Sequence, residues 1–289
     1  MTLPEPPPAG DRALPAGTFA DDVVIVTGGG TGLGKAMATE FARLGASIAV
    51  LSRGEDHRRA GVAAIEELGG RAVGVGVDVR DADAVARAFD AVTAELGTPT
   101  ILVNNAAGNF PVAAEELSPN GWRAVTQIVL DGTFFCSREM ANRLIALGRG
   151  GSILNIAATY AWTGGPSTAH SAAAKAGVVN LTQSLAVEWA PYGIRVNAIA
   201  PGSFMHDDTP EHMRPDGRSE EATAATIPAG RIGRLHELGW AATFLCSPFA
   251  SYITGHTLVI DGGSWLRRGL RMPEFTPVPE QLRRMHEET

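Results

Sequence analysis

Three polar side chains near the middle of the chain have the types and spacing of a catalytic group. Lys175 and Ser171 lie four residues apart in "SAAAKAG", so on a helix they share one face. Tyr160 closely follows the apolar run at 151–157. A tyrosine hydroxyl that lies near a lysine ammonium can donate a proton or a hydrogen bond to a developing oxyanion. The alternative is that Tyr160 is an aromatic packing residue.

The elements that must position these residues can be read from the apolar pattern of the 289-residue chain. Seven short runs rich in Val, Ile and Leu lack strict alternation, which is typical of strands buried on both faces of a parallel sheet. Stretches long enough for crossover helices separate these runs. The strands are expected at 23–27, 47–52, 72–78, 100–105, 151–157, 195–200 and 257–261.

Repeated β–α units predict an α/β fold, a single doubly wound Rossmann-like domain with a seven-stranded parallel sheet flanked by helices. In such sheets, ligands bind beyond the carboxyl ends of the strands. Tyr160 follows one of these ends, and the first turns of the next helix lie on the same rim of the sheet. We therefore expect Tyr160 to converge with Lys175.

No break in composition divides residues 20–265, so we expect them to form one domain. A Pro-rich segment at 1–19 is expected to be a loose arm, and 266–289 a charged C-terminal extension. Residues 201–230 are polar and contain Gly and Pro. A loop of that length in a compact domain usually has a function, so we expect it to cover a ligand.

Composition argues against several classes of protein. The net charge is −7 and there is no long basic run, so nucleic acid is not an expected partner. Cys136 and Cys246 lack metal-ligand spacing, and we expect them to be core residues in a reducing compartment. We find no apolar span of about 18 residues, no secretory signal pattern and no peroxisomal address in the ending "HEET". The expectation is a cytoplasmic protein with no metal and no membrane contact.

The stretch "TGGGTGLG" at 27–34 has the residue types of a phosphate-binding turn. Gly28, Gly32 and Gly34 lie between the first expected strand and an Ala-rich helix. Glycines there let a phosphate approach the backbone, and the helix N-terminus offers N–H groups. Such a turn could be purely structural, but its position between a strand and a helix favours a dinucleotide site.

Residues after the next strands indicate which dinucleotide binds. NAD sites usually place a carboxylate at the end of the second strand, but Ser52 and Arg53 stand there. An arginine can pair with a 2′-phosphate, which favours NADPH, unless Arg53 is a solvated surface residue. Asp78, at the end of the third strand, can accept a hydrogen bond from an adenine amino group, cap the following helix, or do both.

The order of these motifs resembles that of the short-chain dehydrogenase/reductase family. The matching stretches are "TGGGTGLG", "DV" at 78–79, "NNAAG" at 104–108, "AAAKAG", "RVNAIAPG" at 195–202 and "DGG" at 261–263. Within that family, the chain resembles the mitochondrial and peroxisomal 2,4-dienoyl-CoA reductases. This resemblance rests on "GGGTGLGKAM", "SR" at 52–53, "DVRD" at 78–81, "NNAAGNF", "LSPNGW" at 117–122 and "SAAAKAG".

The narrower resemblance implies a set of catalytic residues. The mitochondrial type has a serine four residues before its lysine, as Ser171 is here, and takes its tyrosine from the loop after the fifth strand, where Tyr160 stands. Asp131 occupies a position that is Asn in the mitochondrial and Asp in the peroxisomal enzymes. It could hold a water, or donate a hydrogen bond if burial keeps it protonated. Ala158 replaces the catalytic serine of most of the wider family, which argues against an ordinary ketone reductase.

The resemblance also implies the residues that contact ligands. Arg53, Arg80 and Phe110 are expected to contact an acyl-CoA, although Arg80 could equally be a solvated residue at a helix start. Phe134 and Trp162 are further candidates for an apolar slot. The implied cofactor contacts are Gly28, Thr31, Gly32, Leu33, Gly34, Arg53, Asp78, Val79, Asn105, Ala106, Lys175, Pro201, Gly202 and Phe204.

The activity implied is NADPH-dependent reduction of a 2,4-dienoyl-CoA thioester to a 3-enoyl-CoA, an auxiliary step of fatty-acid β-oxidation, by a homotetramer. A trans-2-enoyl-CoA reductase or another short-chain oxidoreductase is an alternative, because the choice between hydride attack at the δ and the β carbon depends on pocket geometry. A non-catalytic NADP-binding protein would keep the glycines but would not need both Tyr160 and Lys175. The presence of these two residues argues against it.

Overall fold

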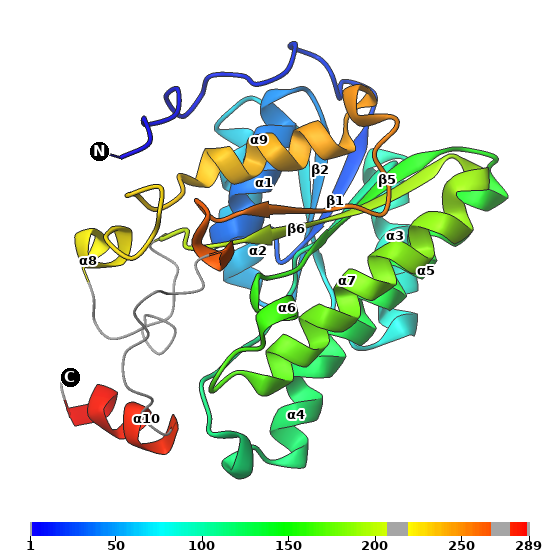
Figure 1. Cartoon of the computed structure of the whole chain (residues 1–289). Helices are drawn as coiled ribbons and strands as arrows, with labels where there is room; N and C mark the ends of the chain where they lie inside the picture. The colour runs from blue at the N-terminus through cyan, green and yellow to red at the C-terminus, as the bar shows by residue number, and fades with distance from the viewer. Residues whose placement is uncertain (1, 207–218, 267–277, 288–289) are drawn as a thin grey trace.

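A single parallel sheet organises the computed structural model, which describes residues 2–206, 219–266 and 278–287. Its seven strands have the order β3-β2-β1-β4-β5-β6-β7 (Figure 1), so the predicted fold class is confirmed. The chain order reverses between β1 and β4, and open sheets of this kind bind ligands at that point. The strands, all within two residues of their predicted bounds, are β1 (Val23–Thr27), β2 (Ser47–Ser52), β3 (Ala72–Gly76), β4 (Ile101–Asn104), β5 (Gly151–Ile156), β6 (Ile194–Pro201) and β7 (Thr257–Ile260).

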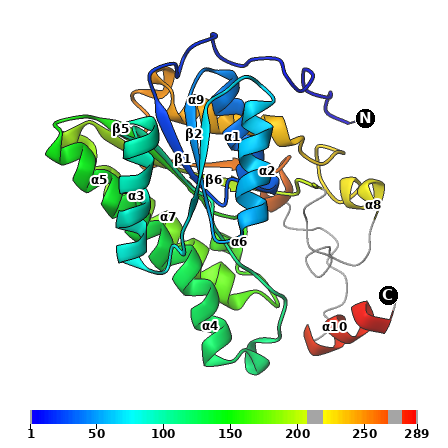
Figure 2. The same ribbon diagram turned by 180° about the vertical axis from the view of Figure 1, so that it is seen from behind.

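Helices cover both faces of the sheet, which explains why the strands are apolar on both sides (Figures 1 and 2). Phe41 packs in the core of one face, and Phe89 packs in the core of the other. Cys246 is buried in the first core and Cys136 in the second, as predicted. The first face carries α1 (Gly32–Arg43), α2 (Glu55–Glu66) and α9 (Leu235–Cys246), and the second carries α3 (Ala82–Leu96), α5 (Gly132–Ala146) and α7 (Ala169–Trp189).

Shorter elements shape the carboxyl edge of the sheet. Helix α4 (Pro119–Thr126) continues through a π-helical turn (Gln127–Asp131) into α5, and α6 (Tyr160–Thr163) is a single turn between β5 and α7. Helix α8 (Glu220–Ala224) belongs to the expected ligand-covering loop, and α10 (Val278–Glu287) belongs to the C-terminal extension. Residues 207–218 of that loop, and residues 267–277 and 288–289 of the extension, lie outside the described residues. Within the described ranges, no helix is long and apolar enough to cross a bilayer.

The Pro-rich N-terminal segment is held against the domain, so the expectation of a loose arm is wrong. The Glu5 carboxylate accepts two hydrogen bonds of 3.0 Å from the guanidinium of Arg234, the residue that precedes α9. The indole N–H of Trp240 on α9 donates to the carbonyl of Asp11 at 3.2 Å. A Pro-rich backbone has few internal hydrogen bonds, so its carbonyls are available to donors on α9, along which the arm runs (Figure 1).

Candidate active site

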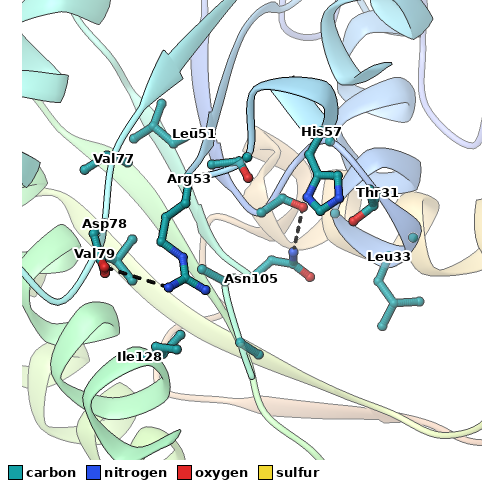
Figure 3. A pocket seen from close by; sticks show the side chains of 18 of the residues that line it. Thr31, Leu33, Leu51, Arg53, His57, Val77, Asp78, Val79, Asn105 and Ile128 are labelled. Atoms are coloured by element: carbon teal, nitrogen blue, oxygen red, sulfur yellow. Dashed lines mark hydrogen bonds and ion pairs between the residues drawn. The ribbon is translucent and has the colours of Figure 1, made fainter. Parts of the chain in front are cut away.

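A cavity of about 650 Å³ opens at the carboxyl edge of the sheet, where the strand order reverses (Figure 3). Its walls come from the Gly-rich turn after β1, the ends of β2 and β3, and the segment after β4. Many of the residues implied to contact a cofactor line it. They are Gly28, Thr31, Gly32, Leu33, Gly34, Arg53, Asp78, Val79, Asn105 and Ala106.

The backbone requires two of the glycines in the turn after β1. Gly28 has φ +65°, a left-handed conformation that favours glycine. A Cβ on Gly34 would lie 2.3 Å from the carbonyl oxygen of Gly28 and 2.5 Å from Nδ2 of Asn105. Asn105 Nδ2 donates to that same Gly28 carbonyl at 3.2 Å, which ties the turn to the end of β4. The turn therefore presents backbone, with no intervening side chain, to this part of the cavity.

The first turn of α1 also lines the cavity. The side chain of Thr31, the N-cap residue, makes no capping hydrogen bond, and no acidic residue lies in the first turn. The positive end of the helix dipole is therefore not neutralised from within the helix. A Gly-rich turn followed by such a helix start suits a phosphate or pyrophosphate group.

Two arginines share one carboxylate at the side of the cavity. Arg80 donates from Nε and Nη2 to Asp78 at 3.0 and 2.6 Å, and this contact holds the pKa of the Asp78 carboxyl below its usual value. Nη1 of Arg53 lies 3.9 Å from Asp78, and Figure 3 shows Arg53 reaching toward that residue. The side chain of Arg53 is 62% exposed, so it can turn toward an anionic ligand.

Asp78 does not cap the helix after β3, so that alternative is wrong. Asp81 is the N-cap of α3, and its carboxylate accepts hydrogen bonds of 2.9 Å from the N–H groups of Asp83 and Ala84. A capping side chain reaches only the second or third N–H group beyond itself, and Asp78 is too far from the helix. Asp78 instead accepts from the backbone N–H of Arg80 at 3.1 Å, within the loop that leads to α3.

The cofactor residues implied at the other end of the site lie beyond this cavity. Pro201 and Gly202 stand at the end of β6, and Lys175 lies on α7. The ring of Phe204 packs against Gly233 and lines a separate cavity of about 130 Å³. The larger cavity therefore suits the adenosine and pyrophosphate half of a dinucleotide, and the nicotinamide half would extend along the sheet toward β5 and β6.

Two histidines that were missed from the sequence also line the larger cavity. His57 lies in the first turn of α2, and Figure 3 shows its ring close to the Gly-rich turn. His57 comes four residues after Arg53, so its position shortly after the second strand could have identified it as a residue of the cofactor site. His206 lies with its ring against Gly32. The path of the loop after β6 brings His206 to the cavity, and no sequence motif predicts that path.

Tyr160 and Ser171 meet at the end of β5. The hydroxyl of Tyr160, the first residue of α6, lies 3.0 Å from Oγ of Ser171 in the first turn of α7. Burial raises the pKa of Tyr160, and the hydrogen bond with Ser171 only partly offsets that effect. The phenol therefore stays protonated at neutral pH, as a hydrogen-bond donor must.

Lys175 is buried on the same helix as Ser171. Its Nζ donates to the carbonyl of Ile156, the last residue of β5. Burial lowers the pKa of Lys175 to about 8. The three expected catalytic residues thus gather at one strand end, but within the described residues Tyr160 bonds to Ser171 and Lys175 bonds to the strand.

The other expected residues lie in the segments that follow β4 and β5. Asp131 ends the π-helical turn, and its side chain makes no hydrogen bond or ion pair with another described residue. π-Helical turns occur often at functional sites. Phe134 and Trp162 are about two-fifths exposed, whereas Phe110 is half-buried against the cluster between α4 and α7.

Phe110 also contacts His170, which was missed from the sequence. The ring centroids lie 4.6 Å apart in an edge-to-face arrangement. His170 is fully buried, and within the described chain neither ring nitrogen has a partner in hydrogen-bond geometry. Burial lowers the pKa of His170, an effect that the backbone of Thr168 partly offsets. Its place directly before Ser171 was the only signal that the sequence contained.

The fold and this site define a dinucleotide-binding oxidoreductase. A family profile described as enoyl-(acyl carrier protein) reductase matches residues 28–264, which include the Gly-rich turn, Tyr160 and Lys175. The chain belongs to the short-chain dehydrogenase/reductase family.

Comparison with individual proteins adds detail. The chain is 45% identical over 244 residues to a Bacillus subtilis protein named a probable 2,4-dienoyl-CoA reductase that produces (2E)-enoyl-CoA, with 84% of this chain and 96% of that protein covered. It is 38% identical to the Arabidopsis thaliana peroxisomal 2,4-dienoyl-CoA reductase that produces (3E)-enoyl-CoA, with 87% of each covered. A structure with bound NADP, described as a 2-deoxy-D-gluconate 3-dehydrogenase from Agrobacterium tumefaciens, has a TM-score of 0.78 and 36% identity over 87% of this chain and 99% of that one.

Proposed function

We propose that this protein catalyses the NADPH-dependent reduction of 2,4-dienoyl-CoA thioesters to 3-enoyl-CoA. The observation that carries the proposal is the half-buried, protonated Tyr160, hydrogen-bonded to Ser171 at the strand end that also holds Lys175 and where Ala158 offers no hydroxyl. The names of the Bacillus subtilis and Arabidopsis thaliana relatives support this substrate class.

The residues present fit NADPH. The turn at Gly28 and Gly34 leaves a cradle that a Cβ would fill, and the start of α1 suits the pyrophosphate. Arg53 stands where a carboxylate would favour NAD, and it can pair with a 2′-phosphate. The NADP bound in the Agrobacterium tumefaciens structure agrees with this choice. When bound, NADPH supplies the hydride that reduces the δ carbon of the diene.

Tyr160 has the central role in the proposed chemistry. As the diene is reduced, negative charge moves through the conjugated system to the thioester oxygen. The phenol of Tyr160 donates a hydrogen bond to that oxygen, and a preorganised donor of this kind typically contributes ~10²–10³ in rate. Ser171 can donate to Tyr160 and so leave the phenol proton for the thioester.

Lys175, Asp131 and the arginines complete the assignment. Lys175 binds the nicotinamide ribose and adds positive charge at the end of β5. Asp131, or a water that it holds, is a second candidate donor to the oxygen. Arg53 and Arg80 lie at the side of the cavity, where they can contact the phosphates of CoA. An auxiliary role in β-oxidation, the homotetramer and the cytoplasmic location stay predictions from the sequence.

The position of proton return decides the product. Protonation of the dienolate at the α carbon leaves the double bond at C3, whereas protonation at the γ carbon leaves it at C2. The Bacillus subtilis relative is named for the (2E) product, which favours γ protonation as a second candidate. Identifying the double-bond position of the product by NMR after complete turnover separates the two.

A three-substrate assay tests the proposed function. We expect kcat/KM for NADPH oxidation to be highest with a 2,4-dienoyl-CoA, compared with a trans-2-enoyl-CoA and a 3-ketoacyl-CoA of equal chain length. A faster reaction with the 2-enoyl thioester would instead identify an enoyl reductase. Preference for the 3-ketoacyl thioester would reject both, as would the absence of turnover despite tight NADPH binding.

A further inference from the structure

Trp162 and Trp265 are far apart in the chain but form an aromatic pair at the carboxyl edge of the sheet. Their ring centroids are 5.5 Å apart, and the ring planes are inclined by 37°. Trp162 follows β5 on α6, and Trp265 follows β7 in the 3₁₀ turn Ser264–Leu266. Because β6 lies between β5 and β7, the pair bridges the end of β6.

Both segments that carry the pair have fixed backbones. The Asp261 carboxylate accepts hydrogen bonds of 2.9 Å from the N–H of Gly263 and 2.6 Å from that of Trp265. On the other side, Gly164 ends α6 with φ +71°, and its N–H donates to the carbonyl of Tyr160 at 3.0 Å. The two indoles are therefore presented by rigid turns, which a binding surface requires.

Trp162 is too exposed for a purely structural role. Its side chain is 43% exposed, Trp265 is half-buried, and Leu266, next to Trp265, is 67% exposed. Exposed apolar groups that gather in this way mark a surface that an apolar partner covers. Trp162 lies two residues after Tyr160 in the single turn of α6, so the pair stands at the same strand end as Tyr160.

We propose that Trp162 and Trp265 form the apolar wall of the acyl-chain site and thereby set the preferred chain length. This inference rests on the proposed function, in which the thioester oxygen of the substrate lies at Tyr160. The aliphatic tail beyond the diene is the only part of that substrate that is apolar, and it must continue away from Tyr160. The aliphatic tail can pack against the rigid tryptophan pair at the end of β6.

A chain-length series tests the wall. For wild type we expect kcat/KM to rise about fourfold per added methylene between 2,4-hexadienoyl-CoA and 2,4-decadienoyl-CoA, the ratio that burial of one CH₂ group gives. Trp265→Ala and Trp162→Ala should lower the decadienoyl value at least tenfold, mainly through KM, and leave the hexadienoyl value within twofold. Trp265→Phe should be intermediate.

A matched control and a binding measurement complete the test. Phe249→Ala removes an aromatic ring that is 61% exposed just before β7, at the opposite edge of the sheet, and should leave the profile unchanged. Calorimetric titration with hexanoyl-CoA and decanoyl-CoA, in the presence of NADP⁺, should show the same chain-length dependence without turnover. Unchanged NADPH affinity of each variant verifies its fold.

The outcomes separate the two proposals. If wild type reduces no dienoyl-CoA but binds decanoyl-CoA more tightly than hexanoyl-CoA in a Trp265-dependent way, the proposed function fails and the wall stands. If both alanine variants keep the wild-type profiles in turnover and in binding, the wall is overturned whatever the reaction is.

Discussion

The hydroxyl of Tyr160 lies 3.0 Å from Oγ of Ser171, and the two residues belong to different helices that meet at the end of β5. Ser171 is buried, and burial also raises the pKa of Tyr160. A serine can donate one hydrogen bond and accept others, so Ser171 can orient the phenol without using the phenol's own proton. Under the proposed function, this relationship assigns the donor role to Tyr160 and a positioning role to Ser171.

Tyr160→Phe should lower the hydride-transfer rate about 10²-fold, because it deletes one donor to an oxyanion and keeps the ring. The interaction strengthens as charge develops, so kcat should fall more than KM rises. The measurement is the rate of a single turnover of hydride transfer to a dienoyl-CoA, with the enzyme saturated by NADPH. A rate within about twofold of wild type would show that Tyr160 only packs.

Ser171→Ala should have a smaller effect, about tenfold on the same rate, because it loosens Tyr160 but keeps its hydroxyl. If Ser171 acts through Tyr160, the double variant should be no slower than Tyr160→Phe alone. Independent, multiplicative losses in that double-mutant cycle would contradict the positioning role.

The sequence predicted the elements that depend on local pattern. The apolar runs located every strand, and the glycines at 28 and 34 indicated a turn that the backbone does require. Tyr160 and Lys175 were placed correctly at one strand end because parallel strands share a carboxyl edge.

Local sequence patterns did not predict the contacts between segments that are distant in the chain. The docking of the arm depends on Glu5 meeting Arg234, and the tryptophan pair depends on turns after two different strands. His170 was missed because its burial follows from how α4 and α7 pack, and no local pattern encodes that packing.

Arg53→Ala should weaken NADPH binding about tenfold and leave NADH binding unchanged. A charge-assisted hydrogen bond contributes about 1.5–3 kcal/mol, and the lower end applies because Arg53 is more than half exposed and solvent screens it. Fluorescence titration with both cofactors measures the effect. Arg59→Ala is the matched control, since Arg59 pairs with Asp56 on α2, and it should bind NADPH like wild type. Equal wild-type affinity for the two cofactors would contradict the role.

Lys175→Met should bind NADPH more weakly but unfold less readily at pH 7. Burial lowers the folded-state pKa of Lys175 from 10.5 to about 8, so between these values the unfolded chain binds more protons and the stability of the wild type rises with pH. Below pH 8 the wild type carries the full penalty of a buried charge. Chemical denaturation should show the variant about 1–3 kcal/mol more stable at pH 7, with the gain shrinking toward pH 10. A gain that is independent of pH would exclude this cause.

His170→Leu should make the protein less sensitive to acid. Burial lowers the folded-state pKa of His170 below its usual 6.5, so as pH falls through 6.5 the unfolded chain takes up a proton that the folded protein resists, and stability is lost. At pH 7.5 both forms are neutral. The variant should then equal or exceed wild type by about 1 kcal/mol, because it removes two buried nitrogens that have no hydrogen-bond partner within the described residues. Urea unfolding at pH 7.5 and 5.5 should show a smaller loss for His170→Leu, whereas His256→Gln, at an exposed histidine, should lose as much as wild type. Equal losses in wild type and His170→Leu would mean that His170 gains a partner in solution and is not buried in the unpartnered, neutral form.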